Sequence, residues 1–99
     1  MGEIIKSISV RALSKEKPKK VRCYFDSGSP RTFISLSAAS QFKGIAELPE
    51  PHVFHGLGDG TFAAMEILSL QFKLLDFWIP YVCYVVPDAT FEPDYNVLI

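Results

Sequence analysis

Short runs that alternate between apolar and polar residues, separated by glycine and proline, most limit what this chain can fold into. In residues 4–13 the apolar members are Ile4, Ile8 and Val10, with Lys6 and Arg11 as polar members. A period of two is typical of a half-buried β-strand. We expect further strands at 21–25, 32–36, 52–55, 61–74, 75–86 and the end of the chain. Many short strands with regular turns predict a small all-β barrel or sandwich.

Turn signals set the expected order of these strands. A solvated loop at 15–20 (KEKPKK) is expected to join the first two strands into a hairpin. Pro49 and Pro51 are expected to separate two halves of the domain, and Pro80 to lie at a strand edge or bulge. The dipeptide at 59–60 (DG) favours a hairpin turn.

One short helix is expected at residues 38–43. Ser37 precedes this segment and can cap it, because a serine side chain accepts a hydrogen bond from a free amide of the first turn. Gly44 follows it as a C-terminal stop.

The composition excludes several classes of protein. Ninety-nine residues suit one domain, 1–99, and 48% hydrophobic with 21% charged residues is ordinary for a globular protein. A net charge of -1 favours neither a nucleic-acid partner nor an anionic membrane. Charged residues interrupt the apolar stretch 65–87, so we expect strands there rather than a membrane span.

The cysteines and the N-terminus bear on the compartment. Cys23 and Cys83 lie inside apolar runs, which favours buried free thiols over a disulfide, although a disulfide stays an alternative. The N-terminus shows no apolar signal core with a cleavage site. Together these observations lead us to expect a reducing, cytoplasmic setting.

A candidate for chemistry is the segment 24–29 (YFDSGS), where Asp26 directly follows an apolar strand. Gly28 allows the backbone to turn, and the Ser27 hydroxyl can donate a hydrogen bond that orients the carboxylate. The alternative is a turn-initiating aspartate with no catalytic role, which is common.

The segment 23–35 (CYFDSGSPRTFIS) resembles the active-site stretch of the retropepsins, with Thr32 and Ile34 at the hydroxyl and apolar places after the aspartate. The helix-like stretch at 37–43, the glycine-rich hairpin at 55–61 and the final NVLI follow in the family's order. The resemblance covers roughly residues 4–99.

This resemblance implies a closed acid-protease barrel that forms one half of a two-fold symmetric aspartic endopeptidase. Two copies would each supply one Asp26, and an extended peptide would be the substrate, with no cofactor, metal or nucleic acid. The implied catalytic residues are Asp26, Ser27 and Gly28. The implied substrate-binding residues are Ser29, Gly56, Leu57, Gly58, Asp59 and Gly60. Thr32, Leu98 and Ile99 are the implied structural support.

The chain departs from the family pattern in two ways. Ser27 stands where threonine is commoner, a change the family accepts. The sequence ends at Ile99, where the family has a glycine followed by a helix and a strand. We therefore expect the C-terminal part of the family domain to be missing.

Other interpretations of the same residues are weaker. The GLGDG segment lacks the following helix of a phosphate-binding loop, and His52 and His55 have no further metal ligand close in sequence. Ser29 lacks the flanking glycines of a nucleophile elbow, and Cys23 has no evident base. An aromatic group is expected to pack in the core or a dimer interface rather than bind a ligand: Phe72, Phe77, Trp78, Tyr81 and Tyr84. The alternative function is a non-catalytic retropepsin-fold module for peptide binding or dimerisation.

Overall fold

The computed structural model describes residues 4–13, 16–25, 31–55, 61–90 and 96–99. Within this part the chain forms seven β-strands, one α-helix and one 3₁₀ helix. In chain order they are β1 (Ile4–Ala12), β2 (Lys19–Phe25), β3 (Thr32–Ser35), α1 (Leu36–Ala39), β4 (Ala46–His55), β5 (Thr61–Leu74), β6 (Phe77–Val86), η1 (Asp88–Thr90) and β7 (Val97–Leu98).

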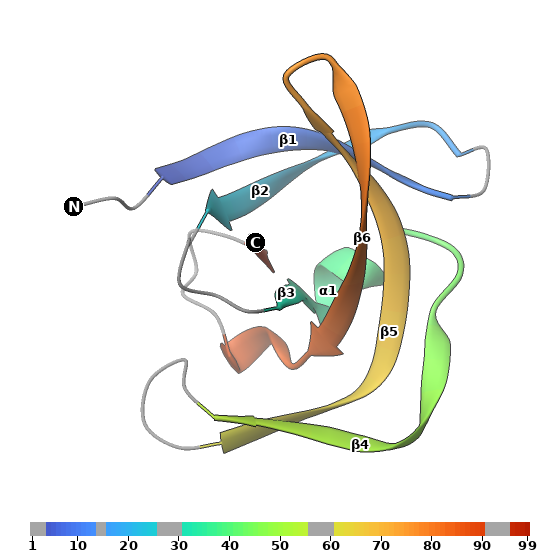
Figure 1. Ribbon diagram of the computed structural model, residues 1–99, viewed down its shortest axis with the longest axis vertical. Helices are drawn as coiled ribbons and strands as arrows, with labels where there is room; N and C mark the ends of the chain where they lie inside the picture. Colours follow the sequence, from blue (N-terminus) through green and yellow to red (C-terminus); the bar gives the residue numbers. More distant parts are fainter. Residues whose placement is uncertain (1–3, 14–15, 26–30, 56–60, 91–95) are drawn as a thin grey trace.

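The strands form one sheet that closes on itself. Hydrogen-bonded neighbours follow the order β1-β2-β7-β3-β6-β5, and β5 pairs back to β1 where Val10 lies opposite Phe72. These six strands make a closed barrel, and β4 extends the sheet outside it by pairing with β5 (Figure 1). The expected small closed β-barrel with one short helix and the expected first hairpin are both confirmed.

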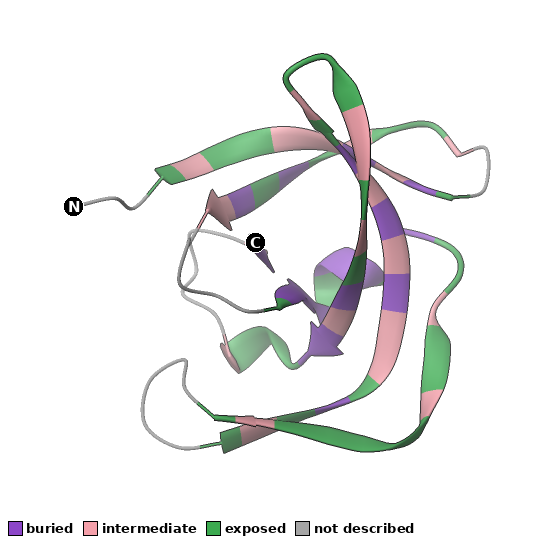
Figure 2. Ribbon diagram, viewed as in Figure 1, coloured by how far each residue is buried: buried purple, intermediate pink, exposed green. Residues whose placement is uncertain are grey.

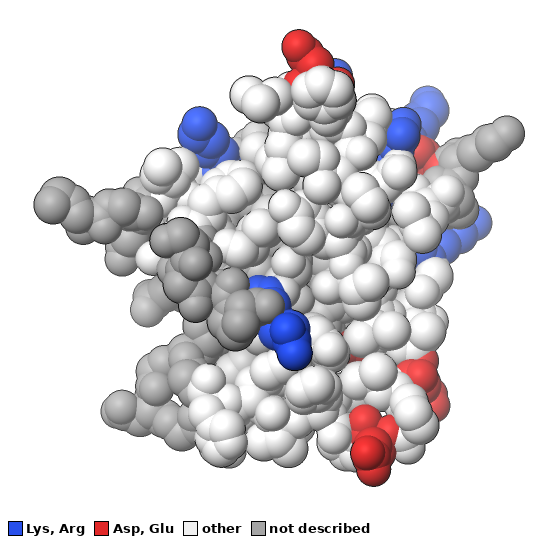
Figure 3. Space-filling model, in the orientation of Figure 1, with Lys and Arg blue, Asp and Glu red and all other residues white. Residues whose placement is uncertain are grey.

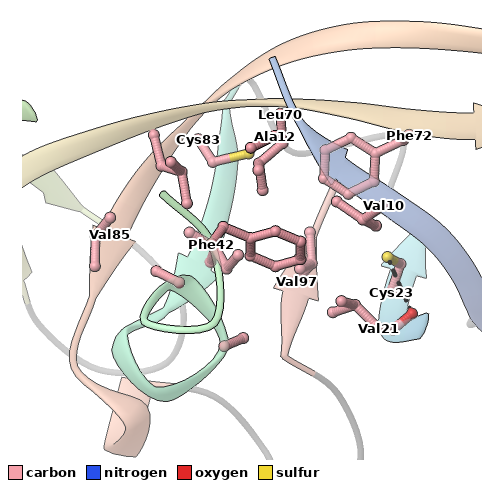
Figure 4. Packing of buried hydrophobic residues seen from close by; sticks show 14 residues of the cluster. Val10, Ala12, Val21, Cys23, Phe42, Leu70, Phe72, Cys83, Val85 and Val97 are labelled. Carbon is pink, nitrogen blue, oxygen red and sulfur yellow. Dashed lines mark hydrogen bonds between the residues drawn. The ribbon is translucent and has the colours of Figure 1, made fainter. Parts of the chain in front are cut away.

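Alternate residues of the strands fill the barrel interior. Val10, Cys23, Leu70 and Cys83 come from four different strands and are all fully buried. Phe42, from the segment after α1, places its ring among them (Figure 4). Burying one side chain of this size contributes roughly 1.5–3 kcal/mol. The buried residues gather at the centre of the molecule, whereas the outer part of β4 and β5 is largely exposed (Figure 2).

The helix differs from its prediction in both position and cap. It spans Leu36–Ala39 rather than 38–43, and its N-cap is Ser35 rather than Ser37. The Ser35 hydroxyl accepts a hydrogen bond from the Ala38 amide at 3.3 Å. Ser35 ends β3 with extended backbone angles, which is the geometry that a capping serine needs.

Contacts around the helix explain why Ser37 does not cap its N-terminus and why the helix ends before Gly44. The Ser37 amide donates to Asp88 Oδ1 at 2.9 Å, so this nitrogen is satisfied by η1. The Ser40 hydroxyl donates to the Leu36 carbonyl at 2.8 Å where the helix ends. Gly44 has a positive φ of 106°, but the helix ends earlier, with Ser40 as its C-cap, so Gly44 is not the C-terminal stop that was predicted.

The expected division at Pro49 and Pro51 is wrong. Both prolines lie within β4, which is longer than the predicted strand 52–55. The strand tolerates them because β4 is at the edge of the sheet and its pairing with β5 is irregular between Glu47 and His52.

The observed strand β6 starts two residues later than the predicted strand 75–86. Leu75, with a positive φ of 57°, belongs to a turn, and β6 begins at Phe77. β6 pairs with β3 from Cys83 onward, and Pro80 lies in the part of β6 before that point. Within the described strands this part pairs with β5 alone, so the edge position predicted for Pro80 is confirmed.

Candidate functional site

The candidate catalytic segment lies between two strands of the barrel. β2 ends at Phe25 and β3 begins at Thr32. The predicted catalytic and substrate-binding residues lie outside the described residues: Asp26, Ser27, Gly28 and Ser29, with Gly56, Leu57, Gly58, Asp59 and Gly60. The site is therefore described from the strands that lead into and out of these segments.

β7 lies between β2 and β3 and joins them. Leu98 pairs with Tyr24 of β2 in parallel and with Phe33 of β3 in antiparallel orientation. The Ile99 amide donates to the Tyr24 carbonyl at 2.9 Å, which extends the pairing by one residue. The end of the chain thus holds together the two strands that flank residues 26–30.

Asn96 strengthens the same junction through its backbone. Its amide donates to the Arg22 carbonyl and its carbonyl accepts from the Ser35 amide, both at 2.9 Å. Its side-chain amide donates to the Ser35 hydroxyl at 3.5 Å. The predicted support residues lie here as well: Thr32 and Leu98 are buried, and Ile99 packs against the barrel core.

An apolar row crosses the outer face of the barrel beside this junction. Residues that pair directly across neighbouring strands point to the same face of a sheet. The register places five side chains in one such row, here called the apolar row: Ile5, Tyr24, Leu98, Phe33 and Tyr84. Their neighbours Cys23, Val97 and Ile34 point into the barrel core, so the row faces outward.

The outer part of the β4–β5 hairpin folds over one end of the apolar row. We call residues 52–55 of β4 and 61–64 of β5 the arm; its last described pair, His55 and Thr61, lies at the two ends of segment 56–60. Phe54 and Phe62 of the arm pack with Phe33, at ring-centroid distances of 4.9 and 5.3 Å. Figure 1 shows β4 and the adjoining part of β5 leaving the barrel and curving below β3.

The arm and the apolar row form a second buried cluster, separate from the barrel core. Its members are Phe33, Ala64, Val86 and Leu98, with Ile5, Tyr24, Phe54, Phe62 and Tyr84 packed against them. None of these side chains carries a formal charge. Basic and acidic side chains are also few and scattered on the face drawn in Figure 3. The second cluster itself therefore suits apolar groups, although the exposed Arg31 directly follows segment 26–30.

This cluster was not predicted, although part of it has a signal in the sequence. The predicted hairpin of 52–55 and 61–74 around segment 56–60 places Phe54 opposite Phe62, as the observed register does. The contact of both rings with Phe33 has no such signal, because it depends on how the arm curves relative to the barrel.

The expected aromatic group at 72–84 is divided between different places. Phe72 is fully buried, and Tyr81 packs against it edge to face at 5.4 Å. Tyr84 belongs to the second cluster, and Trp78 lies under the Arg11 guanidinium at 4.0 Å. Phe77 is 67% exposed, so a core position is wrong for this residue.

The two cysteines are free and buried, as the sequence favoured. Burial raises the pKa of Cys23 to about 12. Burial also raises the pKa of Cys83 to about 12, with a smaller contribution from Cys23. A thiol with so high a pKa stays protonated near neutral pH, which argues against Cys23 as a nucleophile.

Metal-binding clusters and membrane-spanning helices are both absent from the part of the chain that the structure describes. In the described ranges no group of three or more His, Cys, Asp or Glu side chains is arranged to hold a metal ion. In the same ranges no helix has the length and apolar character needed to cross a membrane. Comparison with models of known families, with curated proteins and with solved structures finds no match to the chain.

Proposed function

We propose that this chain is an aspartic endopeptidase whose catalytic dyad forms when two copies each supply one Asp26. The observation that carries the proposal is the insertion of β7 between β2 and β3. A catalytic carboxylate needs rigid support, and here both strands next to segment 26–30 are hydrogen-bonded to the same buried strand. The motif at 26–28 and its resemblance to the retropepsins supply the chemical part of the argument.

The proposed mechanism uses two carboxylates that share one proton, because two adjacent carboxyl groups cannot both ionise easily. The ionised Asp26 acts as general base on a water molecule, which attacks the peptide carbonyl. The protonated Asp26 of the other copy polarises that carbonyl and helps to protonate the leaving nitrogen. Ser27 would brace the loop and Gly28 would permit its turn.

The proposed substrate is an extended peptide held between segment 56–60 and the apolar row. Strand addition would supply backbone hydrogen bonds, and pockets for alternate side chains would supply selectivity. The uncharged second cluster supports this proposal, because a charged peptide side chain placed against it would lose hydration without gaining a partner. We also propose a reducing, cytoplasmic setting, which the free cysteines support.

The first test is cleavage of an unfolded protein, such as reduced and alkylated casein, at mildly acidic pH. Asp26→Asn is expected to lower the rate at least about a hundredfold, because it removes the general acid and base. Asp76→Asn is the matched control, because this substitution makes the same chemical change at an exposed residue in the turn between β5 and β6. This control is expected to keep the wild-type rate.

Two further measurements separate the proposal from a non-catalytic module. The mass in solution shows whether two copies associate, and a statine-type transition-state analogue should inhibit cleavage. The peptidase proposal would be rejected if the wild-type protein is dimeric and binds peptides but cleaves none, and if Asp26→Asn behaves in the same way. That result would favour a peptide-binding or dimerisation module.

A further inference from the structure

The pairing of β4 with β5 is interrupted at the base of the arm. The ladder pairs Glu47 with Glu66 and resumes with His52 opposite Ala64, so residues 48–51 of β4 face a single residue of β5. Two of these four residues are prolines, which have no amide hydrogen to donate. Between β4 and β5, the arm therefore has its own short ladder, separate from the pairing at the base.

Aromatic rings connect the arm to the barrel beyond this interruption. Phe54 packs edge to face on Phe33 of β3 and on Tyr84 of β6, each with ring centroids 4.9 Å apart. Phe62 packs on Phe33 at 5.3 Å and stacks on Phe54 at 5.4 Å. Phe54 thus contacts both β3 and β6, the strands of the barrel on which the arm packs.

His52 extends the same cluster toward the base of the arm. Its ring lies parallel to that of Phe54, at 4.4 Å and with an interplanar angle of 3°. It also meets Tyr84 at 5.2 Å. By contrast, Val53 lies between these two residues in β4 and is 56% exposed, because it points to the other face of the strand.

We infer that Phe54 is a positioning residue, which sets the distance between the arm and β3. The continuous strand β5 carries the arm on one side, whereas on the β4 side the ladder is interrupted at residues 48–51, so side-chain contacts add to the positioning there. Phe54 contacts two rings of the barrel, those of Phe33 and Tyr84, whereas Phe62 and His52 each contact one. The kinetic consequence rests on the proposed peptidase function, whereas the structural consequence does not.

The position of the arm can be measured directly with two spin labels. Val53→Cys places one label on the exposed face of the arm, and Lys20→Cys places the other at an exposed position of β2 in the barrel. Cys23 and Cys83 are buried, so a thiol-specific label is directed to the introduced residues. Pulsed electron spin resonance on labelled protein diluted with an excess of unlabelled protein then gives the distribution of distances between the two labels within one copy.

Phe54→Ala is expected to broaden this distribution and shift its mean, and Phe54→Leu is expected to do so less, because leucine keeps apolar volume without the ring. Phe77→Ala is the matched control, since Phe77 is 67% exposed at the other hairpin. An unchanged distribution in a folded Phe54→Ala protein would overturn the inference. If Phe54→Ala does not fold, Phe54→Leu carries the same test.

Kinetics on the casein substrate test the functional part. Losing the arm's position weakens substrate binding, so KM should rise about tenfold in Phe54→Ala with a smaller change in kcat. A displaced arm with wild-type KM would reject Phe54 as a positioning residue for the reaction. If wild type shows no cleavage at all, the peptidase proposal fails, while the distance measurement still decides the placement of the arm.

Discussion

Cys23 and Cys83 show how burial changes the chemistry of a single residue. Both thiols lie in the barrel core, and burial raises the pKa of each from 9.0 to about 12. In the unfolded chain the thiols ionise above pH 9, whereas in the folded protein they stay protonated until about pH 12. The unfolded state therefore binds fewer protons in this window, and the free energy of unfolding should fall as pH rises through it.

Urea unfolding at about pH 8 and about pH 10.5 measures this effect. The wild type is expected to lose more stability between the two conditions than the double variant Cys23→Ala/Cys83→Ala. Other groups titrate in the same range, so the comparison with the double variant isolates the thiols. An equal loss in both proteins would contradict the assignment to Cys23 and Cys83.

At the scale of the element, α1 depends on which serine caps it. Ser35→Ala removes the acceptor for the Ala38 amide and is expected to cost about 1 kcal/mol in the free energy of unfolding. Ser37→Ala is the matched control, because Ser37 contributes its backbone amide to Asp88 and keeps that amide as alanine. Chemical denaturation of the two variants should place Ser35→Ala clearly below Ser37→Ala.

The cap also shows why element boundaries were harder to predict than element types. The segment 35–37 (SLS) offers two serines, and either suits a helix start by local criteria. Ser35 was selected because β3 ends there in an extended conformation, with η1 supplying Asp88 to the Ser37 amide. Both conditions come from parts of the chain outside the helix.

At the scale of the whole molecule, stability depends on closure of the barrel between β1 and β5. Phe72 pairs with Val10 at this seam and is fully buried. Phe72→Ala is expected to destabilise the protein by about 3–5 kcal/mol, through lost burial and the cavity that remains. Phe77→Ala should change stability by no more than about 0.5 kcal/mol, since its side chain is mostly exposed. Thermal or urea unfolding measures the stability of the two variants. Similar losses of stability in Phe72→Ala and Phe77→Ala would contradict the role of Phe72 in closing the barrel between β1 and β5.

Local sequence patterns account for much of the strand structure. Period-two alternation located most strands, and the position of Pro80 at an edge followed from its missing amide hydrogen. The glycine-containing turns predicted at 26–30 and 59–60 lie outside the described residues, and the turn at Leu75 contains neither glycine nor proline. The apolar surroundings of Cys23 and Cys83 indicated free buried thiols. The roles of Asp26 and of segment 56–60 also came from the sequence, and they stay predictions because these residues lie outside the described ranges.

The pairing of distant segments is a property of the tertiary fold. Val97 pairs with Cys23 and Ile34, more than sixty residues earlier, and no local preference specifies either partner or the opposite strand directions. The contact of Phe54 and Phe62 with Phe33 likewise depends on the curvature of β5. Alternation says which face of a strand is apolar, but the partner of that face depends on how the whole barrel closes.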